Sequence, residues 1–381
     1  MGHLESVLLI CLLLFFLTIK VFFIIYANPL PDEAYYWLWS KNIGLSYFDH
    51  PPLASWIQAS LFSISDNKYF VIRALPVFSL GIVLTITILW QAYMFKKLTY
   101  SICLKSLVLF LAFPIYSIFF SVSFPDYLLI TLLFTSSFCL FLYFDSISKL
   151  GNGIHYWYLA VILFSLALLT KYNAILLGIG VLAYILYYKK KIGGPSFAHI
   201  VASIVIIFLI QTPVLLWNLG NDFASFYFHL GERLDHGKDF QTIFRNVAGF
   251  LLGVILAFSP IFLFNLKNNF ILENFSDYKK NFIKMSKFVF VFSLTFCIFL
   301  CFFTNILYYW LTPAIVLLIP FLINIIKDKI WQYLHIIYGM CISLILVINI
   351  SVYPITAIFG DVDRETAILF GWEKITGVIS K

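Results

Sequence analysis

The stretch VLLICLLLFFLTIKVFFIIYANPLPDEAYYWLWSK, residues 7–41, joins a long apolar run to a cluster of acidic and aromatic residues. Lys20 is the only charged residue of the apolar part, which is long enough to cross the hydrocarbon core of a membrane as a helix. No small-residue cleavage site follows it, so we expect it to stay in the protein as a helix. The polar part after it predicts a loop at the membrane surface.

The composition extends this interpretation to the whole chain. Of its 381 residues 62% are hydrophobic and 11% are charged, and the mean hydropathy is +0.96. In soluble domains about a quarter of the residues are charged, so a soluble globular protein is excluded. The apolar runs lack the two-residue alternation of a membrane barrel, which predicts an all-α polytopic membrane protein. We expect eleven spans, at residues 4–27, 71–95, 103–121, 126–144, 156–170, 173–188, 199–217, 246–266, 288–304, 308–326 and 332–354.

The charged residues between these spans predict the orientation. Loops on one side hold 14 lysines and 4 acidic residues, whereas the other side holds 10 basic and 13 acidic residues. Because cytoplasmic loops carry the excess of basic residues, the N-terminus is predicted to be cytoplasmic and the C-terminus extracytoplasmic. The net charge of +7 then reflects topology, and no nucleic-acid partner is expected. The remaining acids and histidines gather on the outer side, where we expect any functional site.

The first outer loop, residues 28–70, contains two clusters of polar residues. PDEAYYWLWSKN predicts a short helix that begins at Pro31, with Asp32 and Glu33 in its first turn. The second cluster, YFDHPP, places Asp49 and His50 before a proline pair. PPLASWIQASLF after it predicts an amphipathic helix along the membrane interface.

The second outer loop, residues 218–245, has apolar residues at helical intervals over 223–234, which predicts another interfacial helix. His229 and Arg233 are four residues apart and would share one face of it. An imidazole and a guanidinium on one face suit a phosphate or a carboxylate. Solvated charges on an amphipathic helix would give the same pattern.

Six blocks of the chain together resemble one family. They are DEAYYWLWSK, YFDHPPL, FPDYLLI (124–130), LLTKYNAILL (168–177), PVLLWNLGNDFASFYFHLGERL (213–234) and YYWLTPA (308–314). In this order they are similar to the bacterial polyprenyl-phosphate-sugar glycosyltransferases of the membrane-embedded C type. That family includes protein O-mannosyltransferases and the aminoarabinose transferase of lipid A.

The resemblance implies roles for individual residues. Asp32 matches the acid that lines the family's catalytic cavity, Glu33 completes that Asp-Glu motif, and Asp126 matches the acid of the next outer loop. Asp49 matches a position linked to a divalent metal, with His229 as a possible partner. The residues implied in contacts with the carrier phosphate are Tyr47, His50, Lys171, Tyr172 and Arg233.

The sequence also departs from the family pattern. His50 stands where the lipid A transferase has lysine, so a positive charge there would depend on pH. Tyr309 stands where many relatives have histidine, and no basic residue precedes it. Relatives often add a soluble outer domain after the last span, and none is expected here. We therefore expect a transferase domain at 1–354 and a short extracytoplasmic tail at 355–381.

The resemblance implies an enzyme that moves a sugar from a polyprenyl (undecaprenyl) phosphate carrier to lipid A or another envelope glycolipid. It would act at the outer face of the bacterial inner membrane. Protein or polysaccharide acceptors in the same family are alternatives, and a secondary transporter or a non-catalytic scaffold would be of another class. Transporters place ionisable residues near the midplane and repeat their halves, and the sequence shows no repeat.

The cofactor prediction leaves three alternatives for Asp49 and His50. Carboxylate and imidazole ligands suit one divalent cation, zinc, manganese or magnesium. The pair could instead bind the carrier phosphate directly. In the third alternative Asp49 only caps the proline turn and His50 only lies at the headgroup level.

Overall fold

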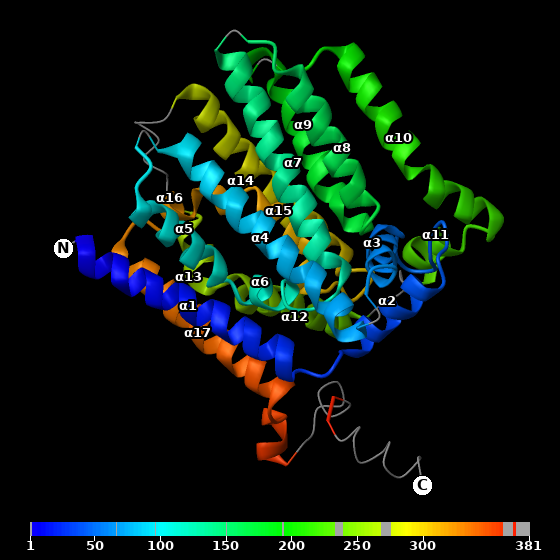
Figure 1. Cartoon of the computed structure of the whole chain (residues 1–381). Coiled ribbons are helices and arrows are strands. Elements are labelled where there is room, and N and C mark those ends of the chain that lie inside the picture. Colours follow the sequence, from blue (N-terminus) through cyan, green and yellow to red (C-terminus); the bar gives the residue numbers. More distant parts are fainter. Residues whose placement is uncertain are drawn as a thin grey trace.

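The computed structural model describes residues 2–65, 67–95, 97–149, 151–192, 194–232, 239–267, 276–360 and 369–370. These residues form helices and short connections, with no strand among them, which confirms the predicted all-α class (Figure 1). The α-helices are α1 Gly2–Tyr26, α2 Pro31–Lys41, α3 Leu53–Phe62, α4 Lys68–Met94, α5 Tyr100–Leu111, α6 Pro114–Phe119, α7 Pro125–Ser148, α8 Ile154–Leu168, α9 Ile175–Ile192, α10 Phe197–Gly220, α11 Ala224–Tyr227, α12 Phe240–Phe258, α13 Pro260–Asn265, α14 Asp277–Leu300, α15 Thr312–Val316, α16 Leu322–Ile325 and α17 Lys329–Ser351.

The chain is a multi-pass membrane protein. Seven of the described helices are long and apolar enough to cross a membrane, and a pair bent by 66° within residues 308–325 would make an eighth. Shorter apolar helices occur at Tyr100–Leu111, Ile154–Leu168 and Tyr172–Tyr188. Each of the eleven predicted spans falls on a helix or on consecutive helices. The number of eleven crossings itself stays a prediction.

Two predicted spans are each broken by a proline. Span 103–121 consists of α5 and α6, which begins at Pro114, and span 246–266 consists of α12 and α13, which begins at Pro260. Proline has no N–H for the helix ladder but fits the first helical position. At the second break Ser259 adopts a positive φ of 67°. The apolar runs did not reveal these breaks because hydropathy is continuous across them.

Helix α17 packs against both breaks. The imidazole of buried His335 contacts Ser259 Oγ at 2.9 Å and the carbonyl oxygen of Leu109 at 3.0 Å. One helical turn further, Gly339 lies so close to Ala112 that a Cβ on it would clash with the Ala112 carbonyl. Only glycine allows this approach, so α17 holds the interrupted helices in place.

The start of the predicted span 288–304 is wrong. Helix α14 begins at Asp277, because its early residues already bury an apolar face that includes Phe282, Ile283 and Met285. Four lysines of the predicted loop before this span lie on the first turns of α14: Lys279, Lys280, Lys284 and Lys287. A count of apolar residues places the start too late where polar and apolar faces alternate at helical spacing.

Helix α7 lies in the centre of the bundle and packs against α4, α8, α14 and α15. Helices α1 and α17 lie side by side along one edge (Figure 1). The short helices α2, α3 and α11 lie at one end, at the right of the view. The helices predicted for the first outer loop are therefore present, and they lie over one end of the bundle.

A buried ion pair connects α2 to the bundle. The Glu33 side chain is fully buried, and its Oε1 lies 2.8 Å from Nη1 of Arg73 in α4. Backbone N–H groups of Leu30 and Ser123 donate to the same carboxylate at 3.0 and 2.7 Å. Arg73 also donates to the carbonyl of Ser121 at 2.6 Å. A buried charge needs such partners, because losing water without them is costly.

Lys20, the basic residue in the middle of α1, is also buried. Its Nζ donates to the carbonyl oxygens of Tyr116 at 3.2 Å and Ser117 at 2.6 Å, near the end of α6. Carbonyls at a helix end carry partial negative charge and lack helical partners. Lys20 therefore stabilises the end of α6, and its contacts are structural.

We expect Arg73→Met to destabilise the protein by about 3–5 kcal/mol, because Glu33 would remain as an unpaired buried carboxylate. Thermal unfolding of the detergent-purified protein measures the change. Lys280→Met is the control, since Lys280 pairs at 3.6 Å with Asp277, whose side chain is 95% exposed, and it should change the midpoint little. Equal midpoints for the two variants would contradict a buried, stabilising pair.

Candidate active site

Two helix starts bring acidic residues to the same end of the bundle. Helix α2 begins at Pro31 with Asp32 in its first turn, and α7 begins at Pro125 with Asp126 in its first turn. In both cases proline occupies a position where the missing N–H costs nothing, and the positive end of the helix dipole favours the carboxylate. The sequence thus builds the same local element twice.

Asp126 forms a buried ion pair with Lys171, which precedes the short 3₁₀ helix η1, Tyr172–Ala174. Lys171 Nζ donates to both carboxylate oxygens of Asp126, at 2.9 and 2.7 Å. The same Nζ lies 4.6 Å from the centre of the Tyr309 ring. The structure therefore brings together three positions that are far apart in the sequence.

The YFDHPP block forms a second polar cluster. Nδ1 of His50 lies 3.3 Å from Oδ2 of Asp49, and the hydroxyl of Tyr35 donates to Oδ1 of Asp49 at 3.1 Å. On its other side, Nε2 of His50 is 3.4 Å from the Tyr36 hydroxyl. His229 contacts the backbone carbonyl of Asp49 through Nε2 at 2.9 Å. The two outer loops thus meet at Asp49.

A cavity of about 190 Å³ is lined by members of both clusters. Five of its lining residues were predicted as site residues, and seven were not. The predicted ones are Asp49, His50, Lys171, Tyr172 and His229, and the others are Asn173, Ile175, Leu176, Phe296, Leu300, Tyr309 and Trp310.

Asp32 is exposed to solvent but lies within the electrostatic field of this cluster. Desolvation by the surrounding protein raises the pKa of its carboxyl group above the ordinary value. The positive charges of His50 and Lys171 oppose that rise, while Asp49 and Asp126 add to it. A carboxylate with a raised pKa is a stronger base than an ordinary aspartate.

Asp49 has the opposite shift. Desolvation would raise the pKa of its carboxyl group, but the contact with His50 and the hydrogen bond from Tyr35 outweigh it and lower the pKa. Burial and the negative charge of Asp49 raise the pKa of Tyr35 to about 12. Asp49 is therefore the ionised partner that orients its two neighbours, and Tyr35 remains a hydrogen-bond donor.

Five predicted site residues do not line the cavity, and two of them, Asp32 and Asp126, are described above. Glu33 is buried against Arg73, as described above. Tyr47 stacks on Trp39 at 4.2 Å between ring centres, and its hydroxyl donates to backbone carbonyls of the same loop. Both hold the loop in shape. Arg233 lies outside the residues that the structure describes.

The predicted metal ligands do not assemble into a complete set. Among the described residues, no three side chains of histidine, cysteine, aspartate or glutamate come close enough to hold a metal ion. Asp49 and His50 are adjacent, but His229 reaches only the Asp49 backbone carbonyl in the contact described above. Asp49 also does not cap the following helix, since α3 has no side-chain cap and its Leu53 N–H donates to the Leu169 carbonyl.

Sequence reasoning missed Asn173 and Tyr309 as parts of the site. Asn173 stands in the quoted block LLTKYNAILL, two residues after Lys171, but its buried position was not evident from the sequence. Tyr309 was noted only as a departure from the family pattern. Its place in the YYWLTPA block was the available signal, because that block occupies a family motif.

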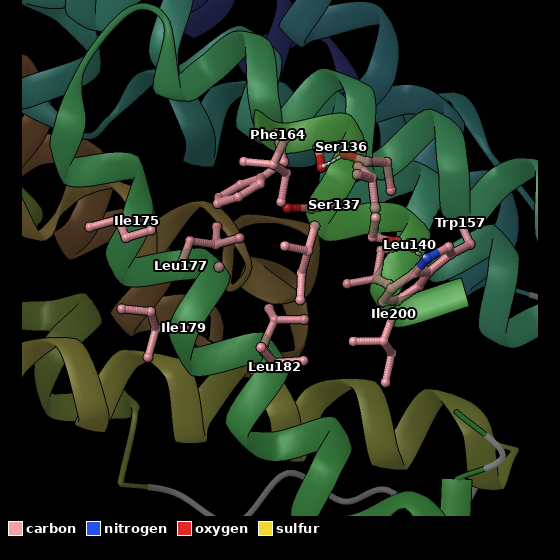
Figure 2. Close-up of a pocket in the computed structure, with 17 residues that line it drawn as sticks. Ser136, Ser137, Leu140, Trp157, Phe164, Ile175, Leu177, Ile179, Leu182 and Ile200 are labelled. Atoms are coloured by element: carbon pink, nitrogen blue, oxygen red, sulfur yellow. Dashed lines mark hydrogen bonds between the residues drawn. The ribbon is translucent and has the colours of Figure 1, made fainter. Parts of the chain in front are cut away.

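A second, apolar cavity of about 200 Å³ lies between α7, α8, α9 and α10 (Figure 2). Figure 2 shows Phe164, Leu177 and Leu182 around it, with Ser136 and Ser137 on the facing helix. Ile175 lines both this cavity and the polar one. A charged compartment and an apolar one are thus neighbours on the first turn of α9.

Comparison with known proteins agrees with this arrangement. The model of the dolichyl-phosphate-mannose-protein mannosyltransferase family matches residues 49–217. A lipid A galacturonosyltransferase, RgtD of Rhizobium johnstonii, is 28% identical over 239 residues, which are 57% of this chain and 46% of that protein. The chain thus spans about half of the length of this relative.

Two solved structures share the fold. The crystal structures of ArnT from Cupriavidus metallidurans, in the apo state and bound to undecaprenyl phosphate, superpose with TM-scores of 0.57 and 0.61 at 14% identity. They cover 87% and 89% of this chain, which covers 63% of theirs. The chain therefore shares the fold of ArnT. The resemblance predicted from the sequence is confirmed, with sequence similarity centred on residues 49–217.

Proposed function

We propose that this protein is a glycosyltransferase that moves a sugar from a polyprenyl phosphate carrier, undecaprenyl phosphate, to lipid A or another envelope glycolipid. The observation that carries the proposal is the polar cavity, in which Lys171 and His50 lie beside two acids and next to an apolar compartment. A phosphate on a long isoprenoid chain presents the same two chemistries. The similarity to RgtD favours lipid A among the acceptors.

The cations would stabilise the carrier phosphate as it leaves. Lys171 uses two of its three N–H groups for Asp126, and one remains for a phosphate oxygen. Asp49 orients the imidazole of His50, whose protonated form would add a second donor. Preorganised donors of this kind are effective because they need not rearrange as charge develops on the leaving oxygen.

Asp32 would act as the general base for a hydroxyl acceptor. The acceptor oxygen attacks the anomeric carbon and gives its proton to the Asp32 carboxylate. The bond from that carbon to the phosphate oxygen breaks, and its electron pair leaves with the carrier phosphate. Such an in-line displacement inverts the anomeric configuration. A phosphate acceptor would need no base, and Asp32 would then only position it.

The arrangement relative to the membrane follows from the charge pattern. We propose that residues 1–354 form the transferase domain, with outer loops 28–70 and 218–245, and that 355–381 form a short tail. The cytoplasmic excess of lysines supports a cytoplasmic N-terminus and an extracytoplasmic site in a bacterial inner membrane. The carrier, its sugar and the lipid acceptor would then meet at the outer face.

Transport is the second candidate function, because charged groups inside the bundle often mark ion or substrate pathways. The buried cations argue for a structural use instead. Lys20 and Arg73 are both occupied by backbone carbonyls or by Glu33 in the part of the chain that the structure describes. Protein and polysaccharide acceptors of the same transferase family remain outcomes of the acceptor experiment below.

Mass spectrometry of lipid A tests the proposed function. Cells that express the protein should carry lipid A with an added sugar, and cells with Asp32→Asn should not, because the amide cannot accept the proton. Membrane levels of the two proteins are compared as a control. Unchanged lipid A in both strains, with new glycans on protein or polysaccharide, would redirect the acceptor assignment. Full transfer by Asp32→Asn would remove Asp32 from the mechanism.

The raised pKa of Asp32 predicts an acid limb in the pH profile of transfer. Activity needs the ionised carboxylate, so it should fall as pH drops through a pKa above the ordinary value for aspartate. His50→Gln removes a positive charge that lowers this pKa, so the limb should move to higher pH. The position of the acid limb is measured from kcat/KM of the purified proteins as a function of pH. A limb that stays in place, or moves to lower pH, would contradict the coupling.

The side chains at Asp49 lead us to expect direct phosphate binding without a required metal. Transfer should therefore resist EDTA, and metal content should be the same in the wild-type protein and in Asp49→Ala. His50→Lys should retain activity, whereas His50→Ala should raise the KM of the donor. Activity that EDTA abolishes and a divalent ion restores would support the metal alternative for Asp49.

A further inference from the structure

Asn173 is a buried amide without a protein partner. Its side chain is 9% exposed, stands in η1 and lines the polar cavity. Within the part of the chain that the structure describes, neither its Nδ2 nor its Oδ1 has a hydrogen-bond partner. Both halves of one carboxamide therefore lack a protein partner in a residue that lines the cavity.

Several other buried amides in the described bundle do find a partner, although Gln58 Nε2 has none among the described residues. Gln91, Gln332 and Asn246 each donate to a backbone carbonyl of another element, at 3.1, 2.7 and 3.3 Å. Asn218 donates to the carbonyl one turn before it at 3.0 Å. A buried polar group without a partner destabilises the folded state, so its position inside a cavity indicates that a ligand completes it.

The chemistry of a carboxamide restricts that ligand. Its nitrogen donates and its oxygen accepts, so a full partner must offer both an acceptor and a donor. A phosphate without a proton only accepts and would leave Oδ1 unpaired. Adjacent hydroxyl groups of a sugar ring both accept and donate, and they can satisfy the nitrogen and the oxygen together.

We propose that Asn173 binds hydroxyl groups of the donor sugar, while Lys171 and His50 bind the carrier phosphate. This inference rests on the proposed transferase function. The backbone of Lys171 is extended, with φ −159° and ψ 131°, and the two residues line one cavity. The cavity would thus divide into a charged part for the phosphate, at Lys171, and a neutral part for the sugar, at Asn173. These two residues are two positions apart in the chain.

Binding to detergent-purified protein tests this division. The probes are undecaprenyl phosphate alone and undecaprenyl phosphate that carries glucose, mannose or galacturonic acid. The wild-type protein should bind one of the sugar carriers more tightly than the bare carrier. Asn173→Ala should bind the bare carrier as the wild type does. It should bind the preferred sugar carrier at least about tenfold more weakly, because alanine cannot form the pair of hydrogen bonds to the sugar.

Thermal unfolding without ligand separates this role from a structural one. Asn173→Ala removes an unpaired group, so its midpoint should equal or exceed that of the wild type. Ser293→Ala is the control: Ser293 is fully buried, its hydroxyl has no partner among the described residues, and it does not line the cavity. That variant should leave both affinities unchanged.

Two results would overturn the inference. One is a variant that unfolds earlier and loses both affinities, which would make Asn173 structural. The other is an equal loss for the bare and the sugar-loaded carrier, which would assign Asn173 to the phosphate. A wild-type protein that binds no carrier at all would instead overturn the proposed transferase function, and the inference with it.

Discussion

The carboxylate of Glu33 is the point on which the geometry of the site depends. It accepts from Arg73 in α4 and from the backbone of Ser123, three residues before Asp126. Asp32, its neighbour in the chain, is held by the same helix α2. One buried side chain thus connects the two helix starts that carry Asp32 and Asp126. In a bundle surrounded by lipid such an anion persists only because a cation and two N–H groups neutralise it.

The membrane also explains why several buried polar side chains of this protein are paired with protein partners. Lys20 binds the carbonyls at the end of α6, His335 joins the two proline breaks, and Asp126 holds Lys171. Each pairing satisfies a helix end or a charge that lipid could not solvate. The charged groups that line the cavity, Asp49, His50 and Lys171, lie at the end of the bundle where α2 and α3 pack. A site for an anionic headgroup can exist there without leaving charge in the hydrocarbon region.

The sequence predicted those parts of the protein that depend on local patterns. The helix that begins at Pro31, the helix after the proline pair and the eleven apolar segments all follow from periodicity and proline position. The blocks that resemble the transferase family also placed five residues in one cavity. The sequence could not predict the ion pairs that join distant segments. Arg73 was only a charge at a span end, and Lys171 had no visible link to Asp126, because such contacts depend on how helices cross. The late start given to α14 has a different cause, since its first turns are polar on one face.

Asp32 and Glu33 show how one short motif supplies two environments. Consecutive residues on a helix point about 100° apart, so when one of them faces the bundle its neighbour faces away from it. Glu33, with the longer side chain, reaches the buried arginine, whereas Asp32 remains exposed to solvent. Burial raises the pKa of both carboxyl groups, but only Asp32 is accessible to a substrate. The resemblance to the transferases treated the two acids as one catalytic motif. Their surroundings support a division instead, in which Asp32 acts on the substrate and Glu33 fixes the loop that presents it.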